Sequence, residues 1–425
     1  MSKQMRKVAI IGGVRTPFVK SFTHYRRITN QDLLTATLRG LVEKYHLQGK
    51  ALGDVGLGAL ITHASDWNLA REAVLGSGLH PTTPAYNVQR ACGTSLETSL
   101  QIALKIAAGQ IESGIAGGSD TNSDVPVTFR REFGWKLTEL RDQPTLFSKL
   151  KQATQFSPKD LAPQILGVRE PRTGLSMGEH CELMVKEWKI SRQEQDELAY
   201  LSHKHAAEAY EQGFYNDLVI EFNGQKKDSI VRKDTSREKL AKLKPAFDRS
   251  EKGTLTAGNS TPLTDGAAAT LLTSEEYAKA NGLEIAAYFV DAQVSAVDFV
   301  GGEGLLMAPT VAVAELLKRN NLKLQDFDFY EIHEAFSGQV LCTLKAWESD
   351  EYCKKRLGLS SALGSIDRNK LNVKGGSVAL GHPFAATGAR IVSGLSKMLK
   401  EKGEGRGLIS VCTAGGMGVA AIIER

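Results

Sequence analysis

The chain repeats one arrangement of residues at two places far apart in the sequence. In each place the chain enters a turn of small residues that carries one reactive side chain, continues as an apolar helix, and then forms a strand that ends in paired glycines. The landmarks are Asn87, Cys92 and Gly117-Gly118 in the first unit and Asn372, His382 and Gly415-Gly416 in the second. Such a repeat indicates an internal duplication of roughly half the chain. Two related halves packed face to face would bring Cys92 and His382 to one cleft.

Strand-like and helix-like runs alternate along the chain, which predicts a layered α/β fold. In the first half, strands are expected over 7–13, 58–62 and 115–120, and helices over 30–42 and 96–108. In the second half, strands over 286–294 and 328–332 and a helix over 311–319 follow the same outline. A chain of 425 residues is too long for one ordinary core. The predicted division is an N-terminal half over 1–127 that continues at 253–283, an inserted loop domain over 128–252, and a C-terminal half over 284–425.

The predicted insertion is more charged and less regular than the segments around it. Leu146, Phe147, Leu150 and Ala153 share one face of a predicted helix. This mildly amphipathic, basic surface is compatible with contact to a membrane or to a partner protein. We favour the alternative that it is an ordinary surface helix lying over a core. Capping-box spacing from Ser191 to Glu194 predicts a long helix that ends near Gly213.

Composition argues against several classes of protein. The net charge of +5, without a long basic run, suits a phosphorylated small molecule but does not indicate nucleic-acid binding. The five cysteines are widely spaced and show no zinc-binding pattern, so we expect no metal site and a reducing compartment. No signal peptide, membrane-spanning run or peroxisomal C-terminal tripeptide is recognised. We therefore expect a cytoplasmic protein.

Cys92 stands between Ala91 and Gly93, where an apolar helix begins. Unpaired backbone N–H groups and the positive end of the helix dipole favour a thiolate at such a position. The small neighbours leave room for a substrate to reach the sulfur. The alternative is an inert core cysteine, and this stretch alone does not decide between the two.

Three later stretches favour the reactive interpretation. His382 stands in a Gly-rich turn that ends at Pro383, which restrains the ring as a catalytic donor requires, although a lone histidine is more often structural. Cys412 ends a strand before the Gly415-Gly416 turn, whose backbone N–H groups are able to form an anion pocket; its alternative is again a core cysteine. His333 ends another strand, and either holds an oxygen atom or only braces the site.

Together these motifs resemble the thiolase family, the acyl-CoA C-acyltransferases, in order and spacing over nearly the full chain. The motifs are the Cys92 turn, Thr256-Ala257-Gly258-Asn259, His333-Glu334-Ala335-Phe336, Gly381-His382-Pro383 and Cys412-Thr413-Ala414-Gly415-Gly416. The resemblance implies a thiolase-like fold of duplicated, layered α/β/α halves with an inserted loop domain. Most thiolases have Asn where this chain has His333. The histidine variant resembles the thiolase subunit of trifunctional-type fatty-acid β-oxidation complexes.

The resemblance implies thiolytic cleavage of 3-ketoacyl-CoA by CoA through an acyl-enzyme at Cys92, which is reversible as a Claisen condensation. The implied catalytic residues are Cys92, His333, His382 and Cys412, and the implied substrate- and CoA-binding residues are Met177, Ala257, Gly258, Thr261, Phe336 and Ala414. CoA is a co-substrate, and no further cofactor is implied. Ala414 departs from the glycine of the family's pattern but keeps the backbone N–H that an oxyanion site needs. Phosphate contact by a basic residue within 233–244 is also plausible.

The resemblance also implies partners. A homodimer or larger assembly is expected, because residues 68–71 match the family's pattern near its dimer face. A hydratase/dehydrogenase subunit is a possible partner, and residues 129–174 match a region that makes membrane or partner contacts in the trifunctional-type group.

Two other functions stay open from the sequence. A decarboxylating condensing enzyme on the same fold uses one Cys and two His, which this chain has, although Cys412 argues against it. A non-catalytic thiolase-like subunit that scaffolds a partner enzyme is the second alternative.

Overall fold

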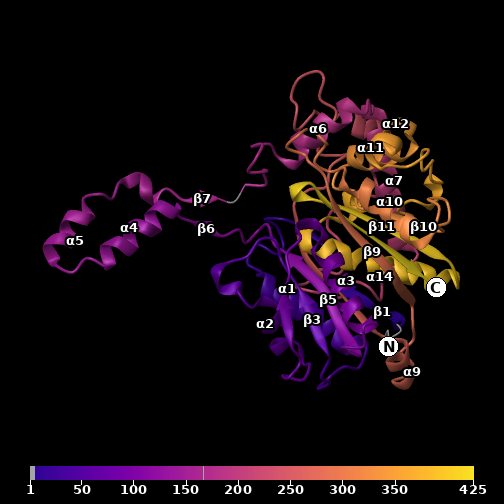
Figure 1. The fold of residues 1–425 in the computed structure, drawn as a ribbon, viewed down its shortest axis with the longest axis horizontal. Helices are drawn as coiled ribbons and strands as arrows, with labels where there is room; N and C mark the ends of the chain where they lie inside the picture. The colour runs from indigo at the N-terminus through magenta and orange to yellow at the C-terminus, as the bar shows by residue number, and fades with distance from the viewer. Residues whose placement is uncertain (1–4, 166) are drawn as a thin grey trace.

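One mixed sheet runs through the body of the molecule in the computed structural model, which describes residues 5–165 and 167–425 (Figure 1). Its strands follow the order β10-β11-β12-β9-β1-β8-β5-β3-β4, and β2 pairs with β8 beside this path. The strands are β1 (Val8–Arg15), β2 (Val19–Lys20), β3 (Asp54–Leu57), β4 (Ala85–Asn87), β5 (Ser113–Asp120), β8 (Thr264–Ser274), β9 (Ala287–Ala296), β10 (Phe329–Ile332), β11 (Arg406–Thr413) and β12 (Met417–Glu424). A separate pair is formed by β6 (Val127–Thr128) and β7 (Gln164–Ile165).

The helices fill the segments between these strands. They are α1 (Asn30–Lys44), α2 (Leu69–Ser77), α3 (Thr94–Ala107), α4 (Arg131–Arg141), α5 (Leu146–Ala153), α6 (Met177–Glu187), α7 (Arg192–Glu211), α8 (Arg237–Ala241), α9 (Glu275–Ala280), α10 (Ala308–Asn320), α11 (Ser337–Glu348), α12 (Asp350–Arg356), α13 (Ser377–Leu380) and α14 (Thr387–Lys402). Short 3₁₀ turns lie at Ala64–Asp66, Ala91–Gly93, Pro158–Leu161, Arg368–Lys370, Phe384–Ala386 and Ala414–Gly416.

The strand order of the N-terminal half is repeated in the C-terminal half. The series β1-β8-β5-β3 corresponds to β9-β12-β11-β10. In each series the first two pairings are antiparallel and the third is parallel. The halves join where β1 and β9 pair antiparallel. The duplication predicted from the paired landmarks is therefore present in the topology.

The helices α3 and α14 pack together on one face of the sheet and contact strands of both halves. The opposite face is covered by α1 and α2 in the N-terminal half and by α10 and α11 in the C-terminal half. Along β1, Val8 and Ile10 belong to the core around α3 and α14, whereas Ala9 and Ile11 belong to the core under α1. Burial on both faces explains why this strand is apolar from Val8 to Val14.

Two helix starts predicted from their sequences are confirmed. The Thr29 hydroxyl accepts the Asp32 backbone N–H at 3.1 Å, and the Asp32 carboxylate accepts the Thr29 backbone N–H at 3.0 Å, which fixes the start of α1. Ser191 and Glu194 form the same reciprocal pair at the start of α7. Each pair satisfies backbone donors that the helix itself leaves free.

The strand predicted over 58–62 is wrong, because β3 already ends at Leu57. The backbone N–H groups of Leu60 and Ile61 donate instead to the Asp120 carboxylate at 2.9 and 2.8 Å. Asp120 is fully buried, so it needs these donors and removes them from any sheet pairing. Residues 58–62 therefore form a turn that is bound to the end of β5 through Asp120.

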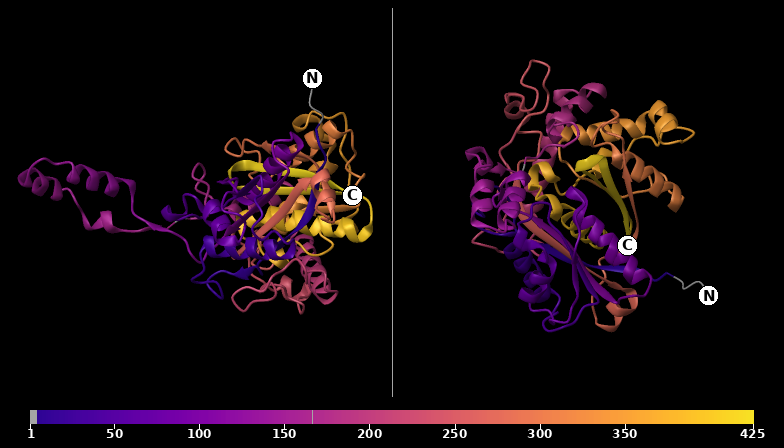
Figure 2. Two further views of the ribbon diagram at one scale, coloured as in Figure 1. Left: turned by 90° about the horizontal axis from the view of Figure 1, so that it is seen from below. Right: turned by 60° about the vertical axis from the view of Figure 1, so that its left-hand side comes forward.

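Residues 127–165 form an arm that projects from the body (Figures 1 and 2). The arm contains α4 and α5, and neither helix has a buried residue. Phe147 is 81% exposed and Trp135 is 61% exposed. The interpretation of the Leu146–Ala153 helix as a surface helix over a core is therefore wrong, because its apolar face meets no core within the described chain. Contact of this arm with a membrane or partner stays a prediction.

No helix in the described part of the chain is long and apolar enough to cross a membrane. The residue boundaries predicted for the two halves and for the insertion stay predictions.

Removal of the arm is expected to leave the fold of the body intact. Thr128 and Gln164 are directly paired, so an Asn-Gly turn is able to replace residues 129–163 and close a two-residue hairpin. Because the arm helices bury no residue, we expect the melting temperature of the body to change by less than about 3 °C, the shift of roughly 1 kcal/mol in a domain of this size. Thermal denaturation followed by circular dichroism measures this. A body that no longer folds would show that the arm is part of its core.

Candidate active site

The turn that carries Cys92 is a single 3₁₀ turn set directly before α3. Ala91 adopts a left-handed backbone conformation with φ of 43°, and the Thr94 hydroxyl accepts the Arg90 backbone N–H at 2.9 Å and donates to the Ala91 carbonyl at 2.7 Å. These constraints fix the direction of the Cys92 side chain. Cys92 remains partly exposed, whereas the other four cysteines are buried, so it is the thiol that a ligand is able to reach.

His333 and His382 come from the other half of the molecule. His333 follows the end of β10, and its backbone N–H donates to the Ser410 carbonyl on β11 at 2.8 Å. His382 lies between α13 and the turn that starts α14, and its backbone N–H donates to the Thr264 hydroxyl at 2.7 Å. The ring centroids of the two histidines are 4.1 Å apart. Both residues are at least 97% buried.

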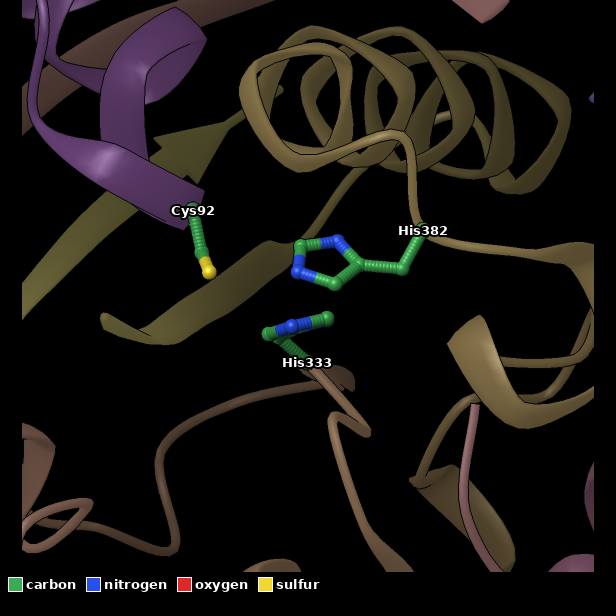
Figure 3. Close-up of side chains that lie close together, drawn as sticks. All are labelled: Cys92, His333 and His382. Carbon is green, nitrogen blue, oxygen red and sulfur yellow. The ribbon is translucent and has the colours of Figure 1, made fainter. Parts of the chain in front are cut away.

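The sulfur of Cys92 points toward the two imidazole rings, as Figure 3 shows. The Cys92 Sγ atom and one ring nitrogen from each of His333 and His382 all lie within 4.8 Å of one another. The Nε2 atoms of both histidines are buried and have no hydrogen-bond partner within the described residues. A nucleophile and two imidazoles with free nitrogens therefore meet at one point. This arrangement suits transfer of the thiol proton and stabilisation of an oxyanion.

Cys412 lies in β11, next to the Ala414–Gly416 turn, and is 1% exposed. Burial raises the pKa of the Cys412 thiol, and the electrostatic effect of Cys92 acts in the same direction. The predicted meeting of both thiols at one site with His382 is therefore consistent with the structure.

Two backbone N–H groups lie against the Cys92 thiol. Hydrogen bonds from the backbone of Ala414 and of Cys92 itself act to lower the pKa of this thiol. Beyond Ala414, the Gly415 N–H donates to the carboxylate of Glu170 at 2.7 Å, which holds the turn in place. Backbone N–H groups beside a nucleophile are the kind of donor from which an oxyanion hole is built.

Comparison with known proteins agrees with this geometry. The family model "Thiolase, N-terminal domain" matches residues 8–276, and "Thiolase, C-terminal domain" matches residues 283–425. The chain belongs to the thiolase family. It is 42% identical to a 3-ketoacyl-CoA thiolase of Serratia proteamaculans, over 98% of this chain and 97% of that protein. It is 40% identical to a 3-ketoacyl-CoA thiolase of Photorhabdus laumondii, over 100% of this chain and 98% of that one.

Two solved structures show the same thiolase fold. The acetyl-CoA acetyltransferase of Bacillus anthracis superposes with a TM-score of 0.82 at 32% identity, and all of both chains is covered. Human mitochondrial 3-ketoacyl-CoA thiolase superposes with a TM-score of 0.81 at 28% identity, over 99% of each chain. The predicted fold of duplicated, layered α/β/α halves is confirmed, and so is the assignment of the chain as an acyltransferase of this family.

The residues expected to bind substrate belong to several elements. Met177 begins α6, and both Met177 and Phe336 pack in the apolar cluster that contains Cys412. The Thr261 hydroxyl donates to the Ser377 carbonyl at 2.8 Å, beside the turn that holds Ala257 and Gly258. Ala257 is exposed and Gly258 is buried. Their roles in binding CoA or the acyl chain stay predictions.

Burial affects the protonation states of Cys92, which stands at a helix start, and of His382. Burial raises the pKa of the Cys92 thiol to about 12, which outweighs the backbone hydrogen bonds that oppose it. Burial also lowers the pKa of His382 to about 3, and the charge of Arg390 acts in the same direction. Burial therefore favours the neutral thiol and the neutral imidazole in the ligand-free enzyme, which opposes the thiolate that the helix start favours. A neutral His382 has the protonation state that a general base needs.

The reactivity of Cys92 toward iodoacetamide should rise with pH in the free thiolase. Because only the thiolate reacts and the thiol pKa is raised, the thiolate fraction grows about tenfold per pH unit below that pKa. We expect the rate of alkylation to increase from pH 6 to pH 9 without a plateau. Mass spectrometry locates the label, and Cys92→Ala serves as the blank. A plateau near neutral pH would instead indicate a thiolate–imidazolium pair.

The contact between α3 and α14 offers a test of how the two halves hold the site. A Cβ atom at Gly388 would lie 2.2 Å from the Leu96 backbone nitrogen, so Gly388→Ala must push these helices apart. We expect a loss of about 1–3 kcal/mol in the free energy of unfolding, together with lower activity. Gly394→Ala is the matched control, because no atom lies within 4 Å of its Cβ position on the same helix. It should be neutral or stabilising. Equal effects of the two substitutions would contradict this account.

Proposed function

We propose that the chain is a 3-ketoacyl-CoA thiolase that cleaves its substrate with CoA to give acetyl-CoA and a shortened acyl-CoA. The observation that carries this proposal is the meeting of the Cys92 sulfur with a ring nitrogen of each of His333 and His382 within 4.8 Å. The names of the relatives at about 40% identity over the full chain support the substrate class.

The first step forms the bond between the enzyme and the substrate. His382 takes the proton of the Cys92 thiol as the sulfur attacks the 3-keto carbon. The negative charge that develops on the keto oxygen is held by the backbone N–H groups of Cys92 and Ala414, and one such donor typically lowers the barrier by about 3 kcal/mol. Because both reacting groups are neutral beforehand, no ion pair has to be maintained in the empty site.

The second step breaks the bond between the α-carbon and the keto carbon. The acyl group stays on Cys92, and the acetyl-CoA part leaves as an enolate. His333 and His382 hold the enolate oxygen through their Nε2 atoms, which have no partner in the described protein. The thiol of Cys412 gives its proton to the enolate carbon and becomes a thiolate.

The third step releases the acyl chain. Cys412 takes the proton of an incoming CoA thiol, and the CoA sulfur attacks the thioester on Cys92. The sulfur of Cys92 leaves and recovers its proton from His382. Every group then has its starting protonation, and the same steps in reverse form a carbon–carbon bond.

One alternative has a structural observation in its favour. A cysteine between two close histidines also suits a decarboxylating condensing enzyme, and the two imidazole centroids are only 4.1 Å apart. Such an enzyme needs no second thiol acid, whereas Cys412 lies within electrostatic reach of Cys92. The scaffold alternative is disfavoured because the reactive residues assemble into one site.

The assembly of the protein is also part of this proposal. We expect a homodimer at least, and the projecting arm at residues 127–165 is the candidate contact with a hydratase/dehydrogenase subunit or a membrane. Gel filtration of the chain alone and with that subunit tests both. A lone monomer that does not co-elute would contradict them.

The activity is tested with a CoA-dependent cleavage assay across 3-ketoacyl-CoA chain lengths. Cys92→Ala should abolish turnover, and Cys412→Ala should lower kcat by about 10²–10⁴-fold, the range for loss of a general acid or base. Cys353→Ala is the matched control, because the hydrogen bonds of this buried thiol are to backbone groups of Ala346, Trp347 and Leu363, none of which is a proposed site residue. Decarboxylation of a malonyl thioester without CoA-dependent cleavage would establish the condensing enzyme instead.

A further inference from the structure

The side of His333 that faces away from the ligand contacts a buried hydroxyl. The Ser377 Oγ atom lies 2.8 Å from His333 Nδ1 and also 2.8 Å from Arg390 Nη2. Ser377 is completely buried and Arg390 is 7% exposed. The three side chains therefore form a continuous line from a buried cation to an imidazole of the active site.

The chemistry of these groups fixes the direction of both hydrogen bonds. A guanidinium has only donors, so Ser377 Oγ must accept from Arg390. The Ser377 hydroxyl then has one hydrogen to donate, and the only acceptor recorded for it within the described residues is His333 Nδ1. If Nδ1 carried a proton instead, the hydroxyl hydrogen would be buried without a partner, which is unfavourable. His333 Nδ1 is therefore the acceptor.

A neutral imidazole has one protonated and one unprotonated nitrogen. Burial lowers the pKa of His333 well below its usual value, and the electrostatic effects of His382 and Arg390 act in the same direction, which favours the neutral ring. With Nδ1 as acceptor, the proton must reside on Nε2. That atom is the one left without a partner in the described protein.

We propose that Arg390 and Ser377 are positioning residues that hold His333 in the Nε2–H tautomer, so that this ring is a fixed hydrogen-bond donor while His382 alone exchanges protons. The inference rests on the proposed function, because it assigns the donor to the enolate oxygen.

His382, the second histidine, contacts a threonine hydroxyl and not a serine hydroxyl that also binds a cation. This difference bears on the separate roles proposed for the two rings. His382 Nδ1 lies 2.5 Å from the Thr387 hydroxyl, and no cation contacts that hydroxyl in the described chain. A threonine hydroxyl is able either to donate or to accept. Thr387 therefore supports His382 without the cation that Ser377 shares with Arg390, and the proposed proton transfer at Nε2 requires the Thr387 oxygen to accept a hydrogen bond from a protonated Nδ1.

Two buried carboxyls, Glu331 on β10 and Glu334 just beyond it, interact electrostatically with Arg390. Burial raises the pKa of both, that of Glu331 to about 8, and the charge of Arg390 opposes this rise. Glu334 is held by Ser202, Asn372 and the Val378 backbone N–H. The hydrogen bond recorded for the Arg390 side chain within the described residues is the one that it donates to Ser377.

The same tautomer has a consequence for metal ions. Cys92, His333 and His382 offer three ligand atoms within 4.8 Å, which is the spacing of a candidate metal site. A metal ion at His333 Nε2 would need the lone pair of that atom, and the Arg390–Ser377 pair places a proton there. The proposal therefore predicts weak metal binding at this cluster.

The direct test measures the tautomer in the wild-type enzyme. Protein labelled with ¹⁵N-histidine is examined by long-range ¹H–¹⁵N correlation spectroscopy, and the His333 signals are identified by their loss in His333→Asn. We expect Nδ1 to resonate as an unprotonated nitrogen and Nε2 as a protonated one at neutral pH. A protonated Nδ1 would overturn the proposal. This readout does not depend on turnover, so it is separate from any failure of the proposed function.

Kinetics provide the second test. Ser377→Ala should lower kcat about tenfold or more with little change in KM, because the donor acts on charge that appears only in the transition state. In the His333→Asn background the same substitution should change kcat less than about twofold, since Ser377 then has no imidazole to orient. An equal loss in both backgrounds would overturn the proposal.

Ser396→Ala is the matched control for this series. Ser396 has a buried hydroxyl on α14 that donates to the Ser393 carbonyl at 3.0 Å, away from the three residues of the line. Its removal should leave kcat, KM and the His333 signals unchanged. A change as large as that of Ser377→Ala would show that loss of any buried hydroxyl produces the effect, and would contradict the proposal.

Discussion

The contact between the first turns of α3 and α14 is the constraint on which the rest of the molecule depends. Gly388 packs so closely on the Leu96 backbone that no side chain fits there, and the Ser95 hydroxyl accepts the Ala389 backbone N–H at 2.8 Å. Asp120 adds a second link, because its buried carboxylate accepts the Ala385 N–H at 2.8 Å while it also holds the turn after β3. The nucleophile precedes α3 and the imidazole base precedes α14. A tight contact between these two helix starts therefore fixes the distance at which the chemistry occurs.

Burial gives this site its second property. In an environment with few charges, the Cys92 thiol and both imidazoles are neutral, since burial raises the pKa of the thiol and lowers those of the rings. Charge appears only during the reaction, where the backbone donors at Cys92 and Ala414 are already oriented. The permanent charge of Arg390 lies one hydroxyl away from His333. It directs a hydrogen bond without entering the reacting centre.

Much of the fold follows from local sequence, and the failures have physical causes. The duplicated landmarks, the start of the helix at Asn30, the Ser191 cap and the buried strand β1 depend on neighbours in the chain, and the sequence predicted them correctly. The strand expected over 58–62 failed because a carboxylate distant in sequence, Asp120, takes its backbone donors. The interpretation of α5 as a surface helix over a core failed because an amphipathic sequence does not show whether the fold places a core beneath its apolar face.

The candidate site also combines residues that local motifs reveal with residues whose importance depends on the fold. The motifs around Cys92, His333, His382 and Cys412 carry a family pattern that the sequence reveals. Ser377 and Arg390 carry no local signal as a pair, because their importance comes from the distance of each to His333 in the fold. The protonation state of Cys92 also depends on burial, which no neighbouring residue reports, and burial of this thiol opposes the thiolate that a helix start favours.

The central claim is that Cys92 carries the acyl group at a site built from both halves. Brief reaction with an acyl-CoA in the absence of free CoA acceptor, followed by acid quenching and peptide mass spectrometry, tests it most directly. The account predicts one acyl group per chain on the peptide that contains Cys92, and its loss when CoA is added before the quench. Acylation of Cys412 in its place, or an unmodified Cys92 in an enzyme that turns over, would contradict the account.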